Sequence, residues 1–305
     1  MTTTPPGFAP PSFTPPDCAP HDPAPKRAAE ALPAHACDVH AHVCGPQSRY
    51  PLIAERLYTP PEASPQDYRH MLDALGIERG VLVQPSIYGN DNRAMLDALA
   101  LDPKRLRGVA VVPFDAPQAE LERLHAAGVR GLRANIVDLK TNKGQLPLDA
   151  LRALAQRIKP MGWHIEFLMH VNEFPQLDQQ LGDFPVDMVF GHLGYVPVAA
   201  GLETPGFAAL LRLMRDGKAW VKLTAPYRLT LSAMPYPDTT PFAQALADAV
   251  PDRLMWGSDW PHVFIKSAMP NDGDLLDVFS KWFPDAAMRK RILVDNPAKV
   301  YDFQA

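Results

Sequence analysis

The chain has 305 residues, of which 47% are hydrophobic, and a formal net charge of −4 at pH 7. This length and apolar content allow one large domain with a substantial core. The negative charge and the lack of a basic run argue against nucleic acid or an anionic membrane surface as a partner. The three cysteines form no paired framework, and no apolar stretch is long enough to span a membrane, so we expect a cytoplasmic protein. The expected partner is a small molecule, and the oligomeric state stays open.

Residues 1–33 contain ten prolines among small and polar residues. Such a segment has little to bury, so it is typical of a flexible or extended arm. It could instead wrap around the folded domain or around a neighbouring subunit. We therefore divide the chain into a proline-rich N-terminal arm, residues 1–33, and one folded domain, residues 34–305.

From residue 36 onward, short runs rich in β-branched residues alternate with segments of helical periodicity. The expected strands are Cys37–Val43, Gly80–Gln84, Gly108–Pro113, Val129–Asn135, His164–Met169, Asp187–His192, Ala219–Thr224 and Leu254–Asp259. The expected helices include Pro65–Leu75, Asn92–Leu101, Gln118–Ala127, Leu148–Ile158 and Pro205–Arg215. Eight alternating units predict an α/β fold, a single (β/α)8 barrel of the TIM type. A doubly wound open sheet is the rival, but no Gly-x-Gly-x-x-Gly follows the first strand.

Two histidines, His40 and His42, end the first expected strand. Residues two apart on a strand point to the same side, so both imidazoles can reach one metal ion or one substrate oxygen. The pair alone is a weak signal, because His-x-His also occurs in solvated loops.

Other polar residues follow the remaining strands, at the end where barrel enzymes carry their active sites. Asp259 follows the eighth run, and an aspartate ionised at neutral pH can act as a general base. His192 ends the sixth run and could polarise a carbonyl or donate to an oxyanion. A helix cap for Asp259 and a buried, satisfied histidine for His192 are the structural alternatives. By contrast, His164 begins the fifth run at the far end of the barrel, where a role in stability is expected.

Two arginines three apart, Arg130 and Arg133, must point to opposite faces of the fourth strand. Arg133 is nearer the mouth and is the expected carboxylate-binding fork, whereas Arg130 should pair with acidic groups outside the sheet. Arg228 after the seventh strand could supply a second cation or form a surface ion pair. Tyr58, in the long loop after the first strand, could pack or contact substrate.

In combination these residues resemble the amidohydrolase superfamily, specifically amidohydrolase-related family 2 and its branch of 2-pyrone-4,6-dicarboxylate hydrolases and related lactonases. The resemblance covers nearly the whole barrel. Its motifs are Asp38-Val39-His40-Ala41-His42-Val43-Cys44-Gly45-Pro46, Gln84-Pro85-Ser86, Gly131-Leu132-Arg133, Gly162-Trp163-His164, His192-Leu193-Gly194 and Gly257-Ser258-Asp259-Trp260-Pro261-His262. It implies a lactone hydrolase in which Asp259 activates water. It further implies two groups of residues: His40, His42 and His192 around the scissile carbonyl, and Tyr58, Ser86, Arg133 and Arg228 on substrate oxygens and carboxylate.

Three departures from the branch fall on the substrate side. Leu139 stands where the resemblance implies an arginine, Leu168 where it implies a tyrosine, and Phe264 where it implies an asparagine. Apolar residues thus replace three polar contacts, which predicts the same reaction class on a different substrate.

The resemblance leaves the metal open, because the superfamily mostly uses a divalent ion while this branch includes metal-independent catalysis. If Leu168 faces the pocket, strand alternation places His170 on the same side, nearest the mouth. His40, His42, His170 and Asp259 would then suit one divalent metal, Zn²⁺ or Mn²⁺. The alternative is that His170 hydrogen-bonds to substrate or to a loop carbonyl.

The sequence therefore predicts a hydrolase that opens the lactone or pyrone ring of a carboxylated small molecule, as occurs in aromatic breakdown. A metal-dependent decarboxylase and a lactone isomerase are the alternatives within the superfamily. A binding protein without catalysis would have little need of both His-x-His and the strand-eight aspartate.

Overall fold

A computed structural model describes residues 14–137 and 145–304 and contains one sheet of eight parallel strands, ordered β1 to β8 around the ring. The strands are β1 (Cys37–Ala41), β2 (Arg79–Val83), β3 (Leu106–Ala110), β4 (Val129–Asn135), β5 (His164–Leu168), β6 (Met188–Phe190), β7 (Ala219–Leu223) and β8 (Leu254–Trp256). The order of the strands confirms the predicted (β/α)8 barrel and excludes the doubly wound sheet.

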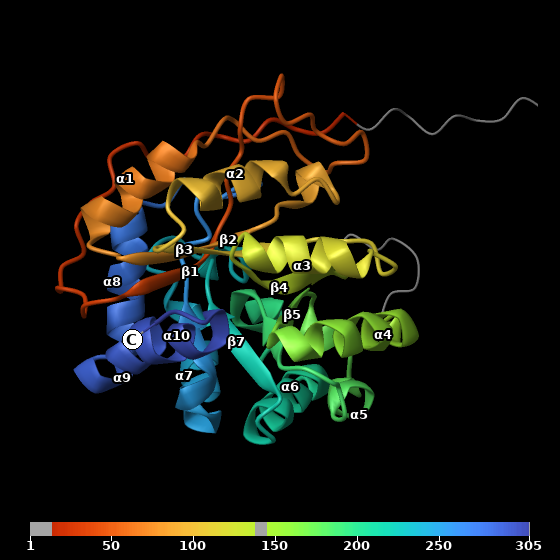
Figure 1. The fold of residues 1–305 in the computed structure, drawn as a ribbon. Coiled ribbons are helices and arrows are strands. Elements are labelled where there is room, and N and C mark those ends of the chain that lie inside the picture. The colour runs from red at the N-terminus through yellow and green to blue at the C-terminus, as the bar shows by residue number, and fades with distance from the viewer. Residues whose placement is uncertain (1–13, 138–144, 305) are drawn as a thin grey trace, which may run out of the picture.

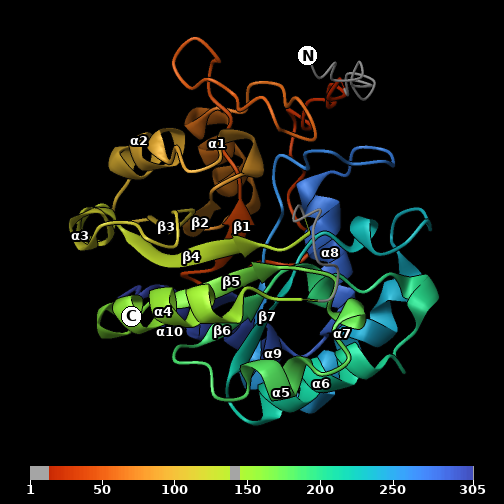
Figure 2. The same ribbon diagram turned by 90° about the vertical axis from the view of Figure 1, so that its right-hand side faces the viewer.

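Helices lie around the outside of the strands in both ribbon views (Figures 1 and 2). They are α1 (Pro65–Leu75), α2 (Arg93–Leu101), α3 (Gln118–Ala126), α4 (Leu148–Ile158), α5 (Leu177–Leu181), α6 (Pro205–Arg215), α7 (Thr240–Ala249), α8 (Asp272–Trp282), α9 (Ala286–Lys290) and α10 (Asn296–Tyr301). Local signals set their ends. In α1, Ser64 and Asp67 form a capping box, and Gly76 ends the helix in the left-handed conformation.

The core has two layers. A large cluster joins the helices to the outward faces of the strands, and a smaller one fills the inside of the barrel. The inner cluster includes Val39, Val81, Val109, Val189 and Met255. The barrel is therefore packed below its mouth, and open space for a ligand is confined to the ends of the strands.

The barrel closes between β1 and the chain that follows β8. The Asp38 carboxylate accepts hydrogen bonds from the Ser258 hydroxyl at 2.6 Å and from the Ser258 backbone N–H at 2.9 Å. It also accepts one from the hydroxyl of Tyr68, on α1, at 3.1 Å. Burial raises the pKa of Asp38 to about 6, although the bonds from Ser258 oppose this rise. The backbone N–H of Asp259 donates to the carbonyl of His40 at 2.8 Å, so the seam also fixes two expected site residues.

The strands are shorter than the predicted runs. β1 ends at Ala41, β6 at Phe190 and β8 at Trp256, so His42, His192 and Asp259 lie just beyond the sheet. An apolar sequence pattern marks the residues that are buried, whereas a strand ends where its backbone hydrogen bonds to the neighbouring strands end. The buried segment is therefore longer than the strand.

The described part of the proline-rich arm, residues 14–33, lies against the folded domain. Cys18 and Thr59 share a backbone hydrogen bond of 2.8 Å. The backbone N–H of Lys26 donates to the Asn271 side chain at the start of α8, also at 2.8 Å. This segment thus wraps the barrel, which was one of the two expectations. Residues 1–13 lie outside the described residues, and the boundary at residue 33 stays a prediction.

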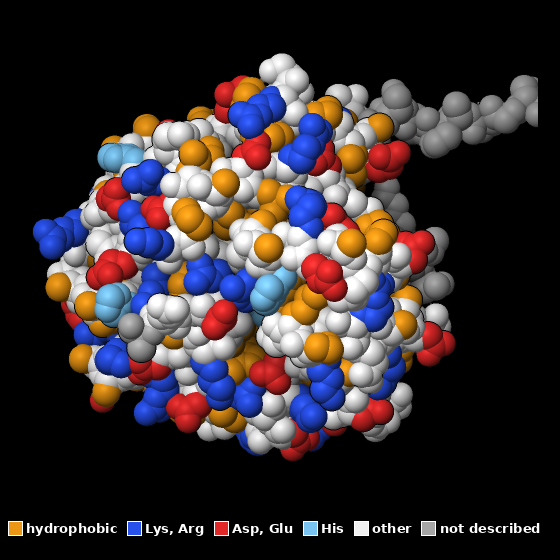
Figure 3. All heavy atoms as spheres, in the orientation of Figure 1, with side chains coloured by type: hydrophobic (Ala, Val, Ile, Leu, Met, Phe, Trp, Pro, Cys, Tyr) orange, Lys and Arg blue, Asp and Glu red, His pale blue; other side chains and the backbone are white. Residues whose placement is uncertain are grey.

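Acidic and basic side chains are interspersed on the face shown in Figure 3. This mixture accords with the small net charge of −4. The three cysteines Cys18, Cys37 and Cys44 are free thiols. Within the described residues, no helix is both long and apolar enough to cross a membrane.

Candidate active site

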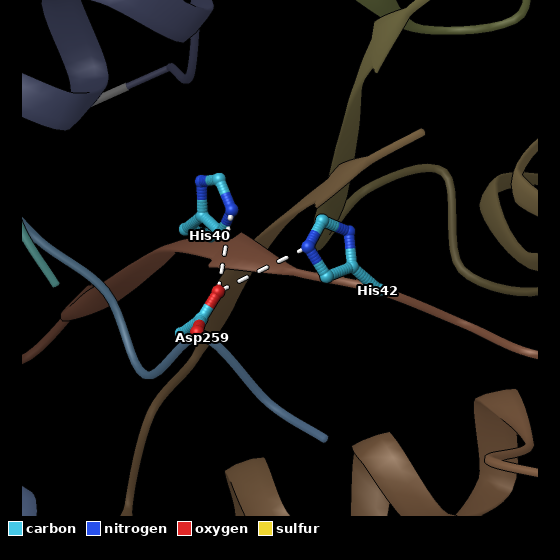
Figure 4. Close-up of side chains that lie close together, drawn as sticks. All are labelled: His40, His42 and Asp259. Atoms are coloured by element: carbon cyan, nitrogen blue, oxygen red, sulfur yellow. Dashed lines mark ion pairs between the residues drawn. The ribbon is translucent and has the colours of Figure 1, made fainter. Parts of the chain in front are cut away.

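His40, His42 and Asp259 meet at the mouth of the barrel, as Figure 4 shows. The two histidines come from β1 and the loop after it, and the aspartate from the loop after β8. Asp259 Oδ1 lies 3.5 Å from His40 Nε2 and 3.9 Å from His42 Nε2. The pairing register of β1 shifts between Asp38 and Ala41. This irregularity turns His40 into the barrel while Asp38 bonds to the outer helix α1.

The two oxygens of Asp259 have different surroundings. Oδ2 is held by Arg228 Nη2 at 2.7 Å and by the Tyr227 hydroxyl at 2.7 Å, whereas buried Oδ1 has no hydrogen-bond partner in the part of the chain that the structure describes. Burial alone would raise the pKa of Asp259, but Arg228, then His192, outweigh it and hold the pKa well below its usual range. Asp259 is therefore ionised, and Oδ1 faces the pocket.

The backbone at the site is strained, with Asp259 at φ 67° and His192 at φ 50°. Side chains other than glycine seldom adopt this left-handed region, and each such residue costs on the order of 1–3 kcal/mol. The strain aims both side chains at the same space.

Two further contacts orient the histidines. His42 Nδ1 lies 2.7 Å from the carbonyl oxygen of Val83, so it carries the proton and Nε2 presents a lone pair to Asp259. His192 Nδ1 lies 2.7 Å from the Thr224 hydroxyl, which leaves Nε2 toward the pocket. Burial lowers the pKa of His42 to about 3, with His40 and Arg133 adding to the effect. Burial likewise places the pKa of His192 well below its usual value, so both rings are neutral.

The two arginines of β4 point in opposite directions, as alternation predicts. Arg133 Nη1 donates to the carbonyl of Gln84 at 2.9 Å, while its buried Nε has no hydrogen-bond partner among residues 14–137 and 145–304. Arg130 instead pairs with Asp302 at 3.2 Å, outside the pocket. An unpartnered guanidinium N–H at a pocket wall is suited to a carboxylate ligand.

These residues line a pocket of about 120 Å³. Its walls are formed by His42, Leu57, Tyr58, Ser86, Arg133, Asn135, Val137, Leu168, His192, Tyr195, Arg228, Asp259, Val263 and Phe264. Tyr58 is buried, stacks on Phe264 with ring centroids 5.6 Å apart and is hydrogen-bonded to Ser86. Of the three departures from the branch, Leu168 and Phe264 are therefore pocket residues, whereas Leu139 lies outside the described residues.

For two residues, His170 and Arg228, the sequence left alternative positions open. His170 does not join His40, His42 and Asp259, because β5 ends at Leu168 and strand alternation does not extend beyond it. Its Nδ1 instead lies 2.8 Å from the carbonyl oxygen of Tyr195, which was the alternative. Arg228 lines the pocket, but it is also the ion-pair partner of Asp259, and that pair is buried.

Two charged residues lie beneath the site. Strand alternation places Glu166 on the pocket side of β5, but sequence reasoning gave it no role and missed Lys222 on β7. Lys222 Nζ lies 2.6 Å from Glu166 Oε2 and 3.2 Å from His40 Nδ1. Lys222 is wholly buried and Glu166 is 1% exposed. A signal existed, because Lys222 interrupts an apolar run expected to be a buried strand, and a buried lysine needs a partner.

A larger cavity of about 440 Å³ lies elsewhere, beside Cys44, Arg49, Asp97 and Leu101. Two of its charged groups, Arg49 and Asp97, form an ion pair of 2.5 Å. The smaller pocket is the candidate active site, because unpartnered buried atoms of a carboxylate and a guanidinium converge there.

The candidate ligand atoms of His40, His42 and Asp259 all lie within 4.8 Å of one another, which is close enough to share a divalent ion. A metal-ligating histidine normally donates its second ring N–H to an acceptor. His42 meets this requirement through Val83. At His40 Nδ1 a carboxylate oxygen of Glu166 lies 3.3 Å away, but the ammonium of Lys222, which cannot accept a hydrogen bond, lies slightly nearer at 3.2 Å.

Comparison with known proteins places this geometry in a family. The amidohydrolase profile matches residues 37–303. The chain belongs to the amidohydrolase family. It is 38% identical to 2-pyrone-4,6-dicarboxylate hydrolase of Comamonas testosteroni, over 87% of this chain and 89% of the relative. It is 37% identical to 4-sulfomuconolactone hydrolase of Rhizobium radiobacter, again over 87% and 89% of the two chains.

The fold comparison agrees with the sequence comparison. This amidohydrolase superposes on a proposed 2-pyrone-4,6-dicarboxylic acid hydrolase from Pseudomonas putida with a TM-score of 0.78 and 36% identity. The match covers 90% of this chain and all of the other. The resemblance stated from motifs is thereby confirmed at the level of the family and of the barrel.

Proposed function

We propose that this amidohydrolase opens the lactone or pyrone ring of a small carboxylated molecule, with Asp259 as the general base. The observation that carries the proposal is the partnerless Oδ1 of Asp259, 3.5 Å from His40 and 3.9 Å from His42 at one end of a pocket that also contains Arg133. The names of the relatives, a pyrone-dicarboxylate hydrolase and a sulfomuconolactone hydrolase, support the same reaction class.

Water activation uses two acceptors. Asp259 Oδ1 and the lone pair on His42 Nε2 can each accept a hydrogen bond from a water molecule held between them. That leaves a water lone pair directed at the ring carbonyl. Asp259 takes one proton as the water oxygen bonds to the carbonyl carbon.

The tetrahedral intermediate places negative charge on the former carbonyl oxygen. The Thr224 hydroxyl accepts from the backbone N–H of His192 at 3.2 Å, which leaves its own proton for Nδ1 of that ring at 2.7 Å. The proton of His192 then resides on Nε2, facing the pocket, where it donates to the oxyanion together with His40. The ring C–O bond breaks, Asp259 returns its proton to the leaving oxygen, and the product is a ring-opened hydroxy acid or its keto tautomer.

Substrate charge assists this chemistry. The resting Asp259 is a weak base, because burial is outweighed by Arg228, then His192, and its pKa is well below the usual range. A carboxylate bound at the free Nε of Arg133 brings a negative charge into the same buried pocket and raises that pKa. The base therefore becomes stronger when the substrate is in place. Tyr58 and Ser86 hold the remaining substrate oxygens.

A zinc or manganese ion held by His40, His42, His170 and Asp259 was the expectation if the site is metallated. The ligand atoms of His40, His42 and Asp259 are close enough, but the ammonium of Lys222 competes with the Glu166 carboxylate for His40 Nδ1, and His170 lies outside the group. The residues present do not fit the metal as a set, so we route no step through it. Metal analysis of the purified protein tests this directly.

The proposal includes a setting. Three free thiols, two of them buried, accord with a reducing compartment, and we propose a cytoplasmic enzyme of aromatic breakdown that takes a small anionic substrate.

The deciding experiment is a turnover screen of lactones and pyrones that carry one or two acidic groups, alongside metal analysis of the same sample. Ring opening of any member supports the proposal. Release of CO₂ with a tightly bound metal would indicate the decarboxylase, and an isomeric lactone product would indicate the isomerase. No turnover of any compound would contradict the assignment.

A further inference from the structure

A charged pair of side chains occupies the inside of the barrel directly beneath His40. Lys222 is fully buried on β7, and its Nζ lies 2.6 Å from Glu166 Oε2 and 2.7 Å from the carbonyl oxygen of Val39. The third neighbour of the ammonium is His40 Nδ1, at 3.2 Å. An ammonium has three protons and no lone pair, so these three contacts use all of its donors.

Such a pair is costly as a purely structural element. The free-energy cost of removing two charges from water is offset only when the geometry and the hydrogen bonds of the pair are good. Apolar residues in the same positions often give a core of equal stability. Apolar side chains, among them Val39, Val189 and Met255, fill much of the same barrel interior. A lysine and a glutamate at this level therefore require a reason, and the one functional group they both reach is His40.

The hydrogen-bond arrangement decides where the proton of His40 resides. Two partners face Nδ1: the ammonium of Lys222 at 3.2 Å and Glu166 Oε1 at 3.3 Å. If Nδ1 carried the proton, that proton would oppose the third proton of Lys222 and leave a buried ammonium N–H without an acceptor. If Nδ1 is bare, Lys222 is fully satisfied, and only one lone pair of Glu166 Oε1 goes unused. The Glu166 carboxylate keeps its bond to Lys222 through Oε2, so this is the cheaper of the two losses.

We propose that Lys222, held in place by Glu166, is a positioning residue that fixes the proton of His40 on Nε2. Among the described residues this buried nitrogen has no hydrogen-bond partner, and it lies 3.5 Å from Oδ1 of Asp259, a residue that lines the pocket. His40 then acts as a neutral donor toward the reacting oxygen, whereas His42 with its proton on Nδ1 acts as an acceptor. The donor role toward the oxyanion rests on the proposed hydrolase function, but the position of the proton does not.

The opposite tautomers of His40 and His42 explain why the two histidines of one motif have different roles. His42 is bonded through Nδ1 to a backbone carbonyl, and His40 through Nδ1 to a side-chain ammonium. One accepts from water and the other donates to substrate. The distinction comes from Val83 on β2 and Lys222 on β7, neither of which the His-x-His motif contains.

The test is ¹⁵N NMR of the full-length protein labelled at histidine, with the His40 resonances assigned by their loss in His40→Gln. The wild-type protein should show His40 protonated at Nε2 and His42 protonated at Nδ1. A wild-type His40 protonated at Nδ1 would overturn the proposal, whether or not any variant folds. This result is independent of substrate, so it separates failure of this inference from failure of the proposed function.

Variants then test the cause. In Lys222→Met the proton should move to Nδ1, where Glu166 accepts it, and kcat should fall roughly 10–100-fold with KM changed little. Lys222→Arg retains a donor and should keep the wild-type tautomer and recover part of kcat. Glu166→Gln keeps the ammonium, so the proton should stay on Nε2. A folded Lys222→Met protein with an unmoved tautomer would show that Lys222 does not set it.

Discussion

The mouth and the floor of the barrel each hold a buried histidine, and the two differ in almost everything except burial. His40 at the mouth is 1% exposed and His164 at the floor is 2% exposed. Burial lowers the pKa of both rings, that of His164 to about 4. His164 packs on the ring of Tyr301, with centroids 5.3 Å apart, and neither of its ring nitrogens has a hydrogen-bond partner.

The difference shows that a buried histidine with a perturbed pKa does not by itself mark a functional site. His40 lies within 3.5 Å of an aspartate, a glutamate and a lysine, which come from three other parts of the ring. His164 has no such charged group within hydrogen-bonding distance among the described residues. Convergence of charged groups from separate strands is the criterion that distinguishes the two ends.

The largest effect is expected at the mouth carboxylate. Asp259→Asn should lower kcat by roughly 10²–10⁴, because the base for water activation is lost while the Arg228 and Tyr227 contacts keep one oxygen in place. The matched control is Asp187→Asn at the floor, whose carboxylate bonds to the indole of Trp220 at 2.8 Å. Steady-state kinetics should show near wild-type turnover for the control. Comparable rates for both variants would remove Asp259 from the mechanism.

A second comparison uses the two ends of β4. Arg133→Ala should raise KM for a carboxylated substrate roughly 10–100-fold, because a charge-assisted contact worth about 1.5–3 kcal/mol is lost. Arg130→Ala should leave KM unchanged and lower the melting temperature slightly, since its partner Asp302 is exposed. Kinetics and thermal unfolding on both variants separate the roles. A KM effect at Arg130 alone would mean that the carboxylate binds elsewhere.

The pH profile gives a third test of the mouth. Asp259 must be ionised to accept a proton, so kcat/KM falls as pH drops through its pKa in the free enzyme. Arg228, acting against the effect of burial, holds that pKa well below its usual value, and kcat/KM should therefore stay level down to about pH 5. In Arg228→Met the acidic limb of the pH profile should move to higher pH by roughly one to three pH units. An unchanged acidic limb in the variant would show that another group controls it.

The floor should respond through stability alone. The pKa of His164 is about 4 in the folded state because burial disfavours the charged ring, whereas an unfolded histidine titrates near 6.5. Between these values the unfolded state binds more protons, so the free energy of unfolding falls as pH falls. His164→Gln should lessen that loss by up to about 2 kcal/mol between pH 7 and pH 5, as measured by urea unfolding, with kcat unchanged. Parallel pH dependences would show that His164 contributes nothing to acid sensitivity.

The smallest effect is expected from deletion of residues 1–33. The described part of this arm contributes contacts such as the hydrogen bond from the Ala29 backbone to Asp277 at 2.8 Å, so the melting temperature should fall by roughly 2–6 °C. The deletion retains β1 and both of its histidines, and kcat should stay within about twofold. Cys18 Sγ accepts from the backbone N–H of Phe264 at a pocket wall. A collapse of kcat in a barrel that circular dichroism shows to be folded would assign the arm to the active site.

Much of the fold and of the mouth was predictable from sequence for a physical reason. Hydrophobic periodicity predicts which segments are buried. In a (β/α)8 barrel the residues that follow the strands meet at one end, which was enough to bring His40, His42, His192 and Asp259 together. The failures come from local geometry that periodicity cannot express. His170 lies past the end of β5, so its direction is set by the loop rather than by alternation.

Pairing between charged groups was the part that the sequence could not supply. Arg228 lines the pocket and also holds Asp259, Glu166 was placed on the pocket side without a role, and Lys222 was not assigned to the site. Which charged groups meet inside a barrel depends on the stagger of strands that are far apart in sequence. The order of residues along one strand does not contain that information.

The central claim, that this amidohydrolase adds water to a cyclic ester, is tested most directly by turnover in ¹⁸O-labelled water. The account predicts one ¹⁸O atom in the newly formed carboxylate of a ring-opened product, no release of CO₂, and loss of that incorporation in Asp259→Asn. A product of unchanged mass without label, or labelled CO₂ in place of a new carboxylate, would contradict it.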